Sequence, residues 1–367
     1  MSVTDAERGQ APPAAALVSG YRPYLDGLRA VAVLLVVAQH VLGANAFELG
    51  GVGVGLFFAL SGYLITSLLL DERALRGSVQ LSRFYLRRAA RLVPALLLVL
   101  VVCDLLFLIQ GDYGPIRGSL FAATYTANYA QVFKGDLVPG FGPTWTLAVE
   151  EHFYILWPLA LLWLTRRHGL QTALKATLGV CVIALAWRFA LAEQGAQIVL
   201  GIGSFERADA LLYGCAAAIA VRLGWRPRTW MFWVGAAAVA YLMRPFLGVP
   251  YSGSVVGSAQ LAIGAAAVVV CLDYASPGWV RQLLSGRALV TVGVISYGLY
   301  LWHGPLMRVA LNWGITGRAW RLLVALVALV LAAASYRYLE RPVRAWARRR
   351  SDGPPPTPEP AGIPARA

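Results

Sequence analysis

Long apolar stretches alternate with short polar segments along almost the whole chain. A hydrocarbon core of about 30 Å takes about 20 helical residues to cross, and each stretch has roughly that length. The pattern therefore predicts an all-α polytopic integral membrane protein with about ten transmembrane helices, near residues 28–46, 53–70, 92–109, 145–165, 173–191, 207–223, 230–247, 254–272, 288–311 and 320–339. The polar and aromatic stretch 119–133 is a candidate for an extra short or re-entrant helix.

The composition supports a membrane location. Hydrophobic residues make up 58% of the chain and charged residues only 14%, which is too apolar for a soluble protein of this length. The formal net charge of +14 would suit a nucleic-acid-binding protein, but basic loops on the cytoplasmic side explain it better in a membrane protein. With a cytoplasmic N-terminus, 24 of the 32 Lys and Arg residues fall on the cytoplasmic side, so we expect both termini there.

The ends of the chain lack apolar stretches of their own. We expect a disordered cytoplasmic tail at 1–20 without a cleavable signal peptide, a transmembrane domain at 21–342, and a basic, then Pro-rich disordered cytoplasmic tail at 343–367. The abundance of Ala, Gly and Arg, with very little Lys, suggests a bacterium of high GC content and hence a multi-pass plasma-membrane protein. The cysteines have no metal-binding spacing and lie in apolar stretches, so free buried thiols are expected at Cys103, Cys181, Cys215 and Cys271.

His40 stands inside the first apolar stretch, eleven residues after Arg29. At the helical rise of about 1.5 Å per residue, His40 lies about 16 Å beyond Arg29, which is about half of the hydrocarbon core. Arg29 is then expected at one membrane interface and His40 near the middle of the bilayer. An ionisable side chain at that depth is costly and marks a candidate functional site.

A cationic cluster is predicted on the cytoplasmic side. Arg88 and Arg91 are three residues apart and share one face of a helix that begins there. These arginines either serve only as topogenic charges or bind, with their planar multi-donor guanidinium groups, the phosphates of a cytosolic molecule such as coenzyme A. Arg29 belongs to the same cluster.

A second polar cluster is predicted from the middle of the membrane to its outer side. It combines residues from four apolar stretches: His40, Glu150, Glu151, His152, Arg207, Asp209 and His303. The two glutamates are either site residues or members of structural Glu–Arg pairs, and Arg207 and Asp209 can pair with each other or with these glutamates. The three histidines lie on different helices without metal-ligand spacing, so no metal is expected.

Two segments can be interpreted either as structural or as functional. Ser61 ends a run of small residues at 51–62 that favours close approach of helices, and its role as a nucleophile is the less favoured alternative. Tyr297, Tyr300 and Trp302 either accompany His303 in a site or form an interfacial aromatic belt.

Taken together, the motifs resemble the membrane-bound acyltransferase family 3, which O-acylates sugars, polysaccharides and macrolides with acyl-CoA. The resemblance runs from Tyr24 to Pro342. Seven motifs in order carry it: Asp26 through Arg29 to His40, the Leu-Phe-Phe-x-Leu-Ser-Gly run at 56–62, Arg88-x-x-Arg91, Trp145 to Tyr154, Arg207-x-Asp209, Tyr297 to His303, and Tyr336-x-x-Leu339-Glu340-x-Pro342.

The resemblance implies roles for individual residues. It implies that Arg29 and His40 are essential, with His40 as the catalytic base, that Arg88 and Arg91 handle acyl-CoA, and that Glu150, Glu151 and His303 belong to the site. The chain departs from the family pattern at two positions. Gly55 stands where an acidic or polar residue is common, and His152 where Gln is usual. We also expect the short form of the family, without an additional soluble domain.

The expected function is acyl transfer, most often of acetyl, from acyl-CoA to a hydroxyl of a carbohydrate, glycan or macrolide acceptor. A neutral His40 would take the hydroxyl proton, and Glu150 or Glu151 would orient its ring. A covalent acyl-His40 intermediate is the alternative to this direct transfer, and the sequence does not choose between them. The alternative is a proton-coupled transporter or flippase of a glycan or metabolite, because carboxylates and histidines inside a membrane also form proton relays. A clear inverted repeat, which many transporters have, is not visible in the sequence.

Overall fold

The computed structural model describes residues 20–43, 47–134, 138–243 and 255–352. Every regular element in these ranges is helical, as the apolar pattern predicts. In chain order the elements are α1 (Pro23–Leu42), α2 (Phe47–Arg76), α3 (Leu81–Ile109), α4 (Gly114–Ala123), α5 (Ala127–Lys134), the 3-10 turn η3 (Gly142–Thr144), α6 (Trp145–Arg167), α7 (Gly169–Glu193), α8 (Gln197–Ile202), α9 (Ser204–Arg222), α10 (Thr229–Tyr241), α11 (Val255–Tyr274), α12 (Gly278–Leu284), α13 (Arg287–Val294), α14 (Ser296–Asn312), α15 (Arg318–Ser335), the π-helical turn η5 (Tyr336–Glu340) and α16 (Arg341–Asp352).

Seven helical runs are long and apolar enough to cross a bilayer. They correspond to α1, α2, α3, α6 with η3, α7, α11, and α15 continued through η5 into α16. The protein is therefore an all-helical, polytopic membrane protein. The described parts of the remaining predicted segments lie mostly on helices, but α9 opens with charged residues and α10 has only 13 residues. The polar and aromatic stretch 119–133 lies on α4 and α5, two short helices.

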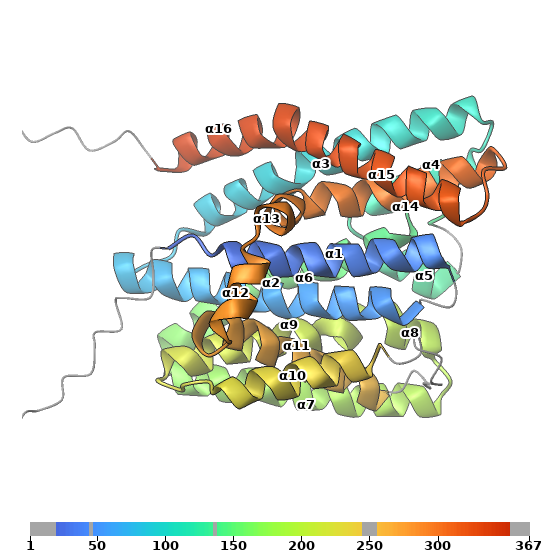
Figure 1. The fold of residues 1–367 in the computed structure, drawn as a ribbon. Helices are drawn as coiled ribbons and strands as arrows, with labels where there is room; N and C mark the ends of the chain where they lie inside the picture. Colours follow the sequence, from blue (N-terminus) through green and yellow to red (C-terminus); the bar gives the residue numbers. More distant parts are fainter. Residues whose placement is uncertain (1–19, 44–46, 135–137, 244–254, 353–367) are drawn as a thin grey trace, which may run out of the picture.

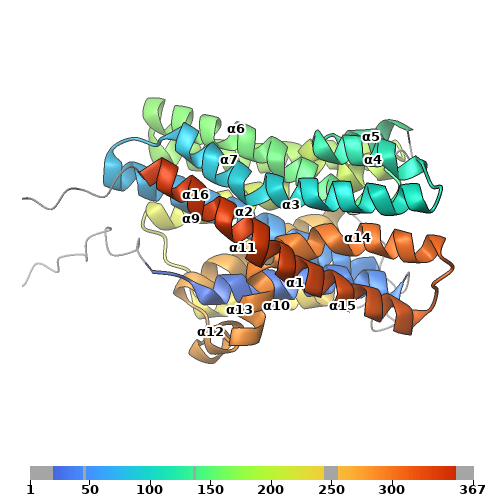
Figure 2. The ribbon, with the colours of Figure 1, turned by 90° about the horizontal axis from the view of Figure 1, so that it is seen from above.

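The expected single helix at 288–311 is broken in two. The first part, α13, ends at Val294, and α14 begins at Ser296. A Cβ atom on Gly293 would lie only 1.8 Å from the carbonyl oxygen of Asp26, so α13 packs with its backbone directly on α1. The chain then turns so that α14 can run beside α3 and α15 (Figure 2).

The described ends of the chain lie at the same end of the helical bundle (Figure 1). We call this the termini end, and we call the opposite end, where α4, α5 and α8 lie, the far end. The continuous run from α15 to α16 crosses the bundle diagonally and returns the chain to the termini end (Figure 2). Residues 343–352, expected to be part of the C-terminal tail, lie within α16, whereas residues 1–19 and 353–367 lie outside the described residues.

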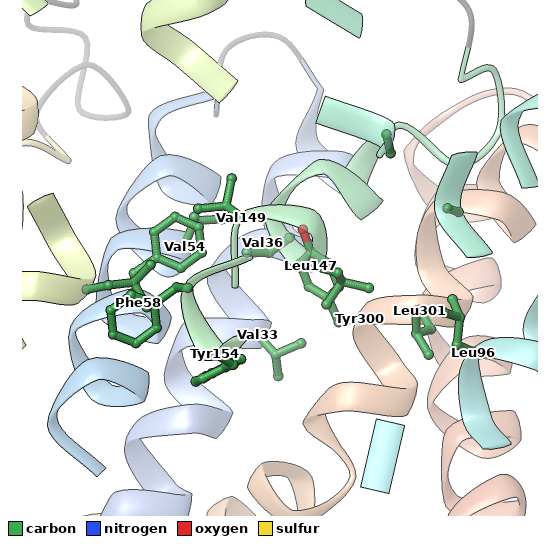
Figure 3. Packing of buried hydrophobic residues seen from close by; sticks show 14 of the residues in the cluster. Val33, Val36, Val54, Phe58, Leu96, Leu147, Val149, Tyr154, Tyr300 and Leu301 are labelled. Carbon is green, nitrogen blue, oxygen red and sulfur yellow. The ribbon is translucent and has the colours of Figure 1, made fainter. Parts of the chain in front are cut away.

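Small residues bring α2 into direct contact with its neighbours, as the run at 51–62 predicts. A Cβ atom on Gly62 would lie 1.9 Å from the carbonyl oxygen of Leu211 in α9. No larger residue fits there without a shift of one backbone, so α2 and α9 form one of the closest helix pairs of the bundle. Around them packs a large apolar cluster that includes Val36, Val54 and Phe58, which Figure 3 shows between the helices that carry them.

A polar cluster that the sequence analysis missed ties three helices together at the termini end. The carboxylate of Asp273 on α11 has only 4% of its side chain exposed. It accepts hydrogen bonds from the side chains of Arg22 at 2.6 Å, Tyr24 at 2.8 Å and Tyr63 at 2.5 Å. These contacts fix the start of α1 against α2 and α11, and so set the position of the rest of α1. The four cysteines are free and buried, which confirms the prediction for them.

Candidate active site

Two adjoining cavities bring together most of the residues singled out from the sequence. The inner cavity has a volume of about 100 Å³, and its polar lining consists of Arg29, Ser61, Arg88, Arg91, Thr146, Glu150, Tyr154, Ser296, Tyr297 and Tyr300. The outer cavity has a volume of about 840 Å³ and lies toward the far end; its polar and aromatic lining includes Gln39, His40, Gln131, Trp145, Arg188, Arg207 and Tyr300. Val54 and Tyr300 line both cavities, so the two meet at these side chains.

His40 is a half-buried residue on the wall of the outer cavity. Its Nδ1 lies 2.8 Å from the carbonyl oxygen of Val36. Since a carbonyl oxygen can only accept, Nδ1 must carry the hydrogen, and the lone pair of a neutral ring is then on Nε2. His40 stands in the last turn of α1, because that helix begins at Pro23 and ends at Leu42. The sequence pattern predicts a position for His40 about halfway through the membrane. In the structure His40 lies near the end of α1.

His303 lies directly beside His40, although the two come from α14 and α1. Their ring centroids are 4.8 Å apart and the ring planes meet at 77°. His303 is completely buried, and its Nδ1 donates to the carbonyl oxygen of Tyr300 at 2.7 Å. Its Nε2 is buried and has no hydrogen-bond partner within the described part of the chain. The structure thus joins two of the predicted site residues into one pair of imidazoles.

The inner cavity holds the cationic cluster and one carboxylate. Glu150 accepts a hydrogen bond from the hydroxyl of Ser61 at 2.9 Å. The Nε of Arg29 is buried and has no hydrogen-bond partner among the described residues. The sequence offered no carboxylate near Ser61, because Glu150 comes from α6 and reaches it only through the packing of α6 against α2.

The guanidinium of Arg88 is held in a structural contact with two side chains of α6. Its guanidinium donates to Glu151 at 2.5 Å and lies 3.0 Å from the centre of the Tyr154 ring. The side chains of Arg88 and Glu151 are only 12% and 16% exposed. The Glu–Arg pair left open as an alternative is therefore present in the structure. Arg91, by contrast, lines the same cavity with no hydrogen bond or ion pair to another described residue.

The contacts of Glu150 and Glu151 differ from the expectation that one of them orients His40. Successive residues of a helix point about 100° apart, and so the two glutamates face different partners, Ser61 and Arg88. The His40 ring is held instead by the carbonyl oxygen of Val36 and by contact with His303. A backbone carbonyl thus has the orienting role that the sequence analysis gave to a carboxylate.

Asp209 forms an ion pair that the sequence analysis did not anticipate. Its partner is Arg188 of α7, at 2.6 Å, and the two side chains are 3% and 2% exposed. Arg207, one of the partners left open for Asp209, makes no ion pair with a described residue, and its Nε is buried without a hydrogen bond to a described residue. Its guanidinium lies 6.0 Å from the centre of the Trp145 ring. Arg188 was missed although it lies near the end of a largely apolar stretch, where a charge is itself a signal.

The two positions that depart from the family pattern have ordinary contacts. The Nδ1 of His152 lies 2.8 Å from the hydroxyl of Ser204 at the start of α9. Gly55 faces the side chain of Leu261, which a Cβ atom would approach to 2.7 Å. No group of three His, Cys, Asp or Glu side chains placed to hold a metal ion occurs in the described ranges.

Comparison with known proteins agrees with the motif order. A family model described as an acyltransferase domain matches residues 22–337. The peptidoglycan O-acetyltransferase OatA of Listeria monocytogenes is 30% identical over 355 residues, which cover 88% of this chain and 56% of the relative. The putative peptidoglycan O-acetyltransferase YrhL of Bacillus subtilis is 32% identical over 359 residues, covering 88% and 55%. The O-acetyltransferase OatA of Staphylococcus aureus is 30% identical over 356 residues, covering 88% and 57%.

The chain therefore spans a little over half the length of the curated relatives it matches. No solved structure matches it.

Proposed function

The chain belongs to the membrane-bound acyltransferase family 3, and from this premise we propose that it transfers an acyl group, expected to be acetyl, from acyl-CoA to a hydroxyl of a carbohydrate acceptor. The observation that carries the proposal is the state of His40. Its Nδ1–H is held by a backbone carbonyl, and its Nε2 lone pair belongs to a ring on the wall of a cavity large enough for a sugar. This is the geometry of a general base that receives a proton from a bound hydroxyl.

The reaction is a direct transfer in this proposal. The acceptor oxygen attacks the thioester carbonyl while His40 Nε2 takes its proton; the C–S bond then breaks, and the coenzyme A thiolate leaves and takes up that proton. His303 keeps the His40 ring in place by edge-to-face contact. Because Nδ1–H of His40 is already bonded, the proton has only Nε2 to go to, and the ring does not have to turn during the reaction.

The donor is proposed to enter from the termini end. The described lining of the inner cavity contains Arg29, Arg88, Arg91 and one carboxylate, Glu150, and Arg88 is paired with Glu151. A cavity lined by three guanidinium groups and one carboxylate suits a molecule that carries phosphates. Arg91 makes no hydrogen bond or ion pair to another described residue, whereas Arg88 is paired with Glu151, so we assign the phosphate contact first to Arg91 and only second to Arg88.

The topology fits this direction of approach. We propose ten spans, with both termini in the cytoplasm of a bacterium and the far end outside the plasma membrane, because the described ends lie together and the basic residues concentrate on that side. The outer cavity then faces the cell surface, where a glycan acceptor is found, and the relatives named above as peptidoglycan O-acetyltransferases agree with such an acceptor. A macrolide or other glycosylated metabolite is the other acceptor class to test.

The test uses purified protein, labelled acetyl-CoA and a panel of sugars, peptidoglycan fragments and macrolides. His40→Ala is compared with His168→Ala, which removes an exposed histidine from the loop between α6 and α7. We expect label on an acceptor hydroxyl and a loss of about 10²- to 10⁴-fold in kcat for His40→Ala only, the usual size of general-base catalysis. Near-normal transfer by His40→Ala would refute the role of His40. If wild-type protein transfers no label to any acceptor, and changes of Arg88 and Arg91 cause no loss of coenzyme A binding, a transporter becomes the better interpretation.

A further inference from the structure

The outer cavity has a positively charged wall. Its described lining contains two arginines, Arg188 and Arg207, and His40, but no Asp or Glu side chain. Gln39, Gln131 and Ser258 are its neutral polar members. A cavity that had only to hold a neutral sugar would need donors and acceptors but no net charge.

One of the two arginines is already neutralised. Arg188 donates to Asp209 at 2.6 Å, and the other oxygen of that carboxylate accepts the backbone N–H of Ala210 at 2.8 Å. Each carboxylate oxygen of Asp209 therefore already accepts a hydrogen bond. Only 2% of Asp209 is exposed, so its carboxylate does not face the cavity. The carboxylate neutralises one guanidinium, and the charge of Arg207 is left over.

The position of Arg207 argues against a purely structural role. It lies in the first turn of α9, which begins at Ser204, and a positive charge is unfavourable at the positive end of the helix dipole. Its Nε is buried without a hydrogen-bond partner in the described ranges, and its nearest aromatic contact, Trp145, is at the long distance of 6.0 Å. Arg207 has to share the one carboxylate of Asp209 with Arg188, which is costly in such surroundings unless a ligand supplies further counter-charge.

We propose that the acceptor bound in the outer cavity carries an anionic group, a carboxylate or a phosphate, that pairs with the guanidinium of Arg207. This inference rests on the proposed function and specifies its acceptor class as an acidic carbohydrate. The anion binds at the α9 side of the cavity, while the reacting hydroxyl of the same molecule faces His40 on α1. Arg207 is thus a specificity-determining residue, and Trp145, on the same wall, provides an aromatic surface beside it.

The experiment compares matched acceptors that differ only in charge. One pair is a glycan fragment with a carboxylate and its methyl ester; the other is a phosphorylated sugar and the same sugar without phosphate. The variants are Arg207→Gln, Arg207→Lys and, as a control, Arg318→Gln, which removes an exposed positive charge at the start of α15 outside the cavity.

We expect wild-type protein to prefer the charged member of one pair, and that pair identifies the anion as carboxylate or phosphate. Arg207→Gln should raise KM for that member by about 10- to 100-fold, as expected for the loss of a charged hydrogen bond. It should leave KM for the neutral member and for acyl-CoA unchanged. Arg207→Lys should recover part of the loss, and Arg318→Gln should behave as wild type.

Three results would overturn the inference. They are equal KM values for the charged and neutral members of both pairs in wild-type protein, an equal rise for both members in Arg207→Gln, or a rise in KM for acyl-CoA, which would assign the anion to the donor. Equilibrium binding of the same fragments separates this inference from the proposed function. Binding of the acidic fragment that depends on Arg207, without acyl transfer by wild-type protein, would uphold the anion site and refute the transferase. If Arg207→Gln does not fold, Arg207→Lys and the acid–ester comparison in wild-type protein decide the outcome.

Discussion

The Arg188–Asp209 pair offers the sharpest test of how this bundle tolerates buried charge. The two side chains are 2% and 3% exposed and meet at 2.6 Å. Asp209→Asn removes the negative charge with almost no change in shape. It leaves Arg188 buried without a carboxylate, and Arg207, two residues away, without the nearest negative charge. Breaking a buried pair by removing one partner costs about 3–5 kcal/mol, and we expect a loss of stability of this size.

A matched control exists at the far end of the bundle. Asp112 lies 3.7 Å from Arg308, and these side chains are 26% and 41% exposed. Because solvent screens such a pair, Asp112→Asn should cost less than about 1 kcal/mol. Reversible unfolding of both variants by denaturant titration in mixed micelles gives the two free energies under identical conditions.

A double variant completes the test. Arg188→Gln with Asp209→Asn removes both charges, so its cost should be clearly smaller than the sum of the two single costs. The reasoning would be refuted if Asp209→Asn were no more destabilising than Asp112→Asn. It would equally fail if the costs of the two single changes simply added in the double variant, because the charges would then not be coupled.

Two further predictions concern the close helix contact and the donor. Gly62→Ala should destabilise the protein by about 1–3 kcal/mol, because the new Cβ would lie 1.9 Å from the Leu211 carbonyl oxygen. Gly179→Ala, whose Cβ has nothing within 4 Å, should cause no loss when both variants are compared by thermal unfolding, and equal losses would contradict the packing argument. Arg91→Gln should raise KM for acyl-CoA by about tenfold or more if Arg91 binds phosphate, as judged from initial rates. Arg83→Gln, a change on the same helix outside the cavity, should leave that KM unchanged, and an unchanged KM in Arg91→Gln would remove Arg91 from the donor site.

The sequence was sufficient to place most of the helices and to name most of the candidate site. Apolar stretches of bilayer length mark α1, α2, α3, α6, α7, α11 and α15, because the bilayer requires both the length and the apolar character. Charged and imidazole groups inside such stretches are so costly that they point to a site without any structure. For this reason His40, Arg29, Arg91, Glu150 and Arg207 were identified, and the structure places all five on the walls of two adjoining cavities.

The partners of these residues were not predictable in the same way. Hydrophobic patterning says which segments cross the membrane but not which segments are neighbours. Glu150 with Ser61, and Arg188 with Asp209, meet only because α6 packs on α2 and α7 on α9. The break between α13 and α14 was hidden for a related reason. Its local sequence, at 288–302, has no Pro and no charged residue, and the close approach of Gly293 to α1 is a tertiary contact.

The shared wall of the two cavities has a consequence for the cell as well as for the enzyme. Val54 and Tyr300 line both spaces, and the Tyr300 hydroxyl is fixed by Thr146 at 2.7 Å and by the carbonyl oxygen of Pro143 at 2.7 Å. If the two spaces joined with no substrate filling the opening, a continuous polar path would run through the bundle, and ions would leak across the membrane down the electrochemical gradient. The side chains of Val54 and Tyr300 must therefore be large enough to keep the two spaces apart, so that the membrane does not leak ions. A variant at either position should be tested for proton leak in sealed vesicles as well as for turnover.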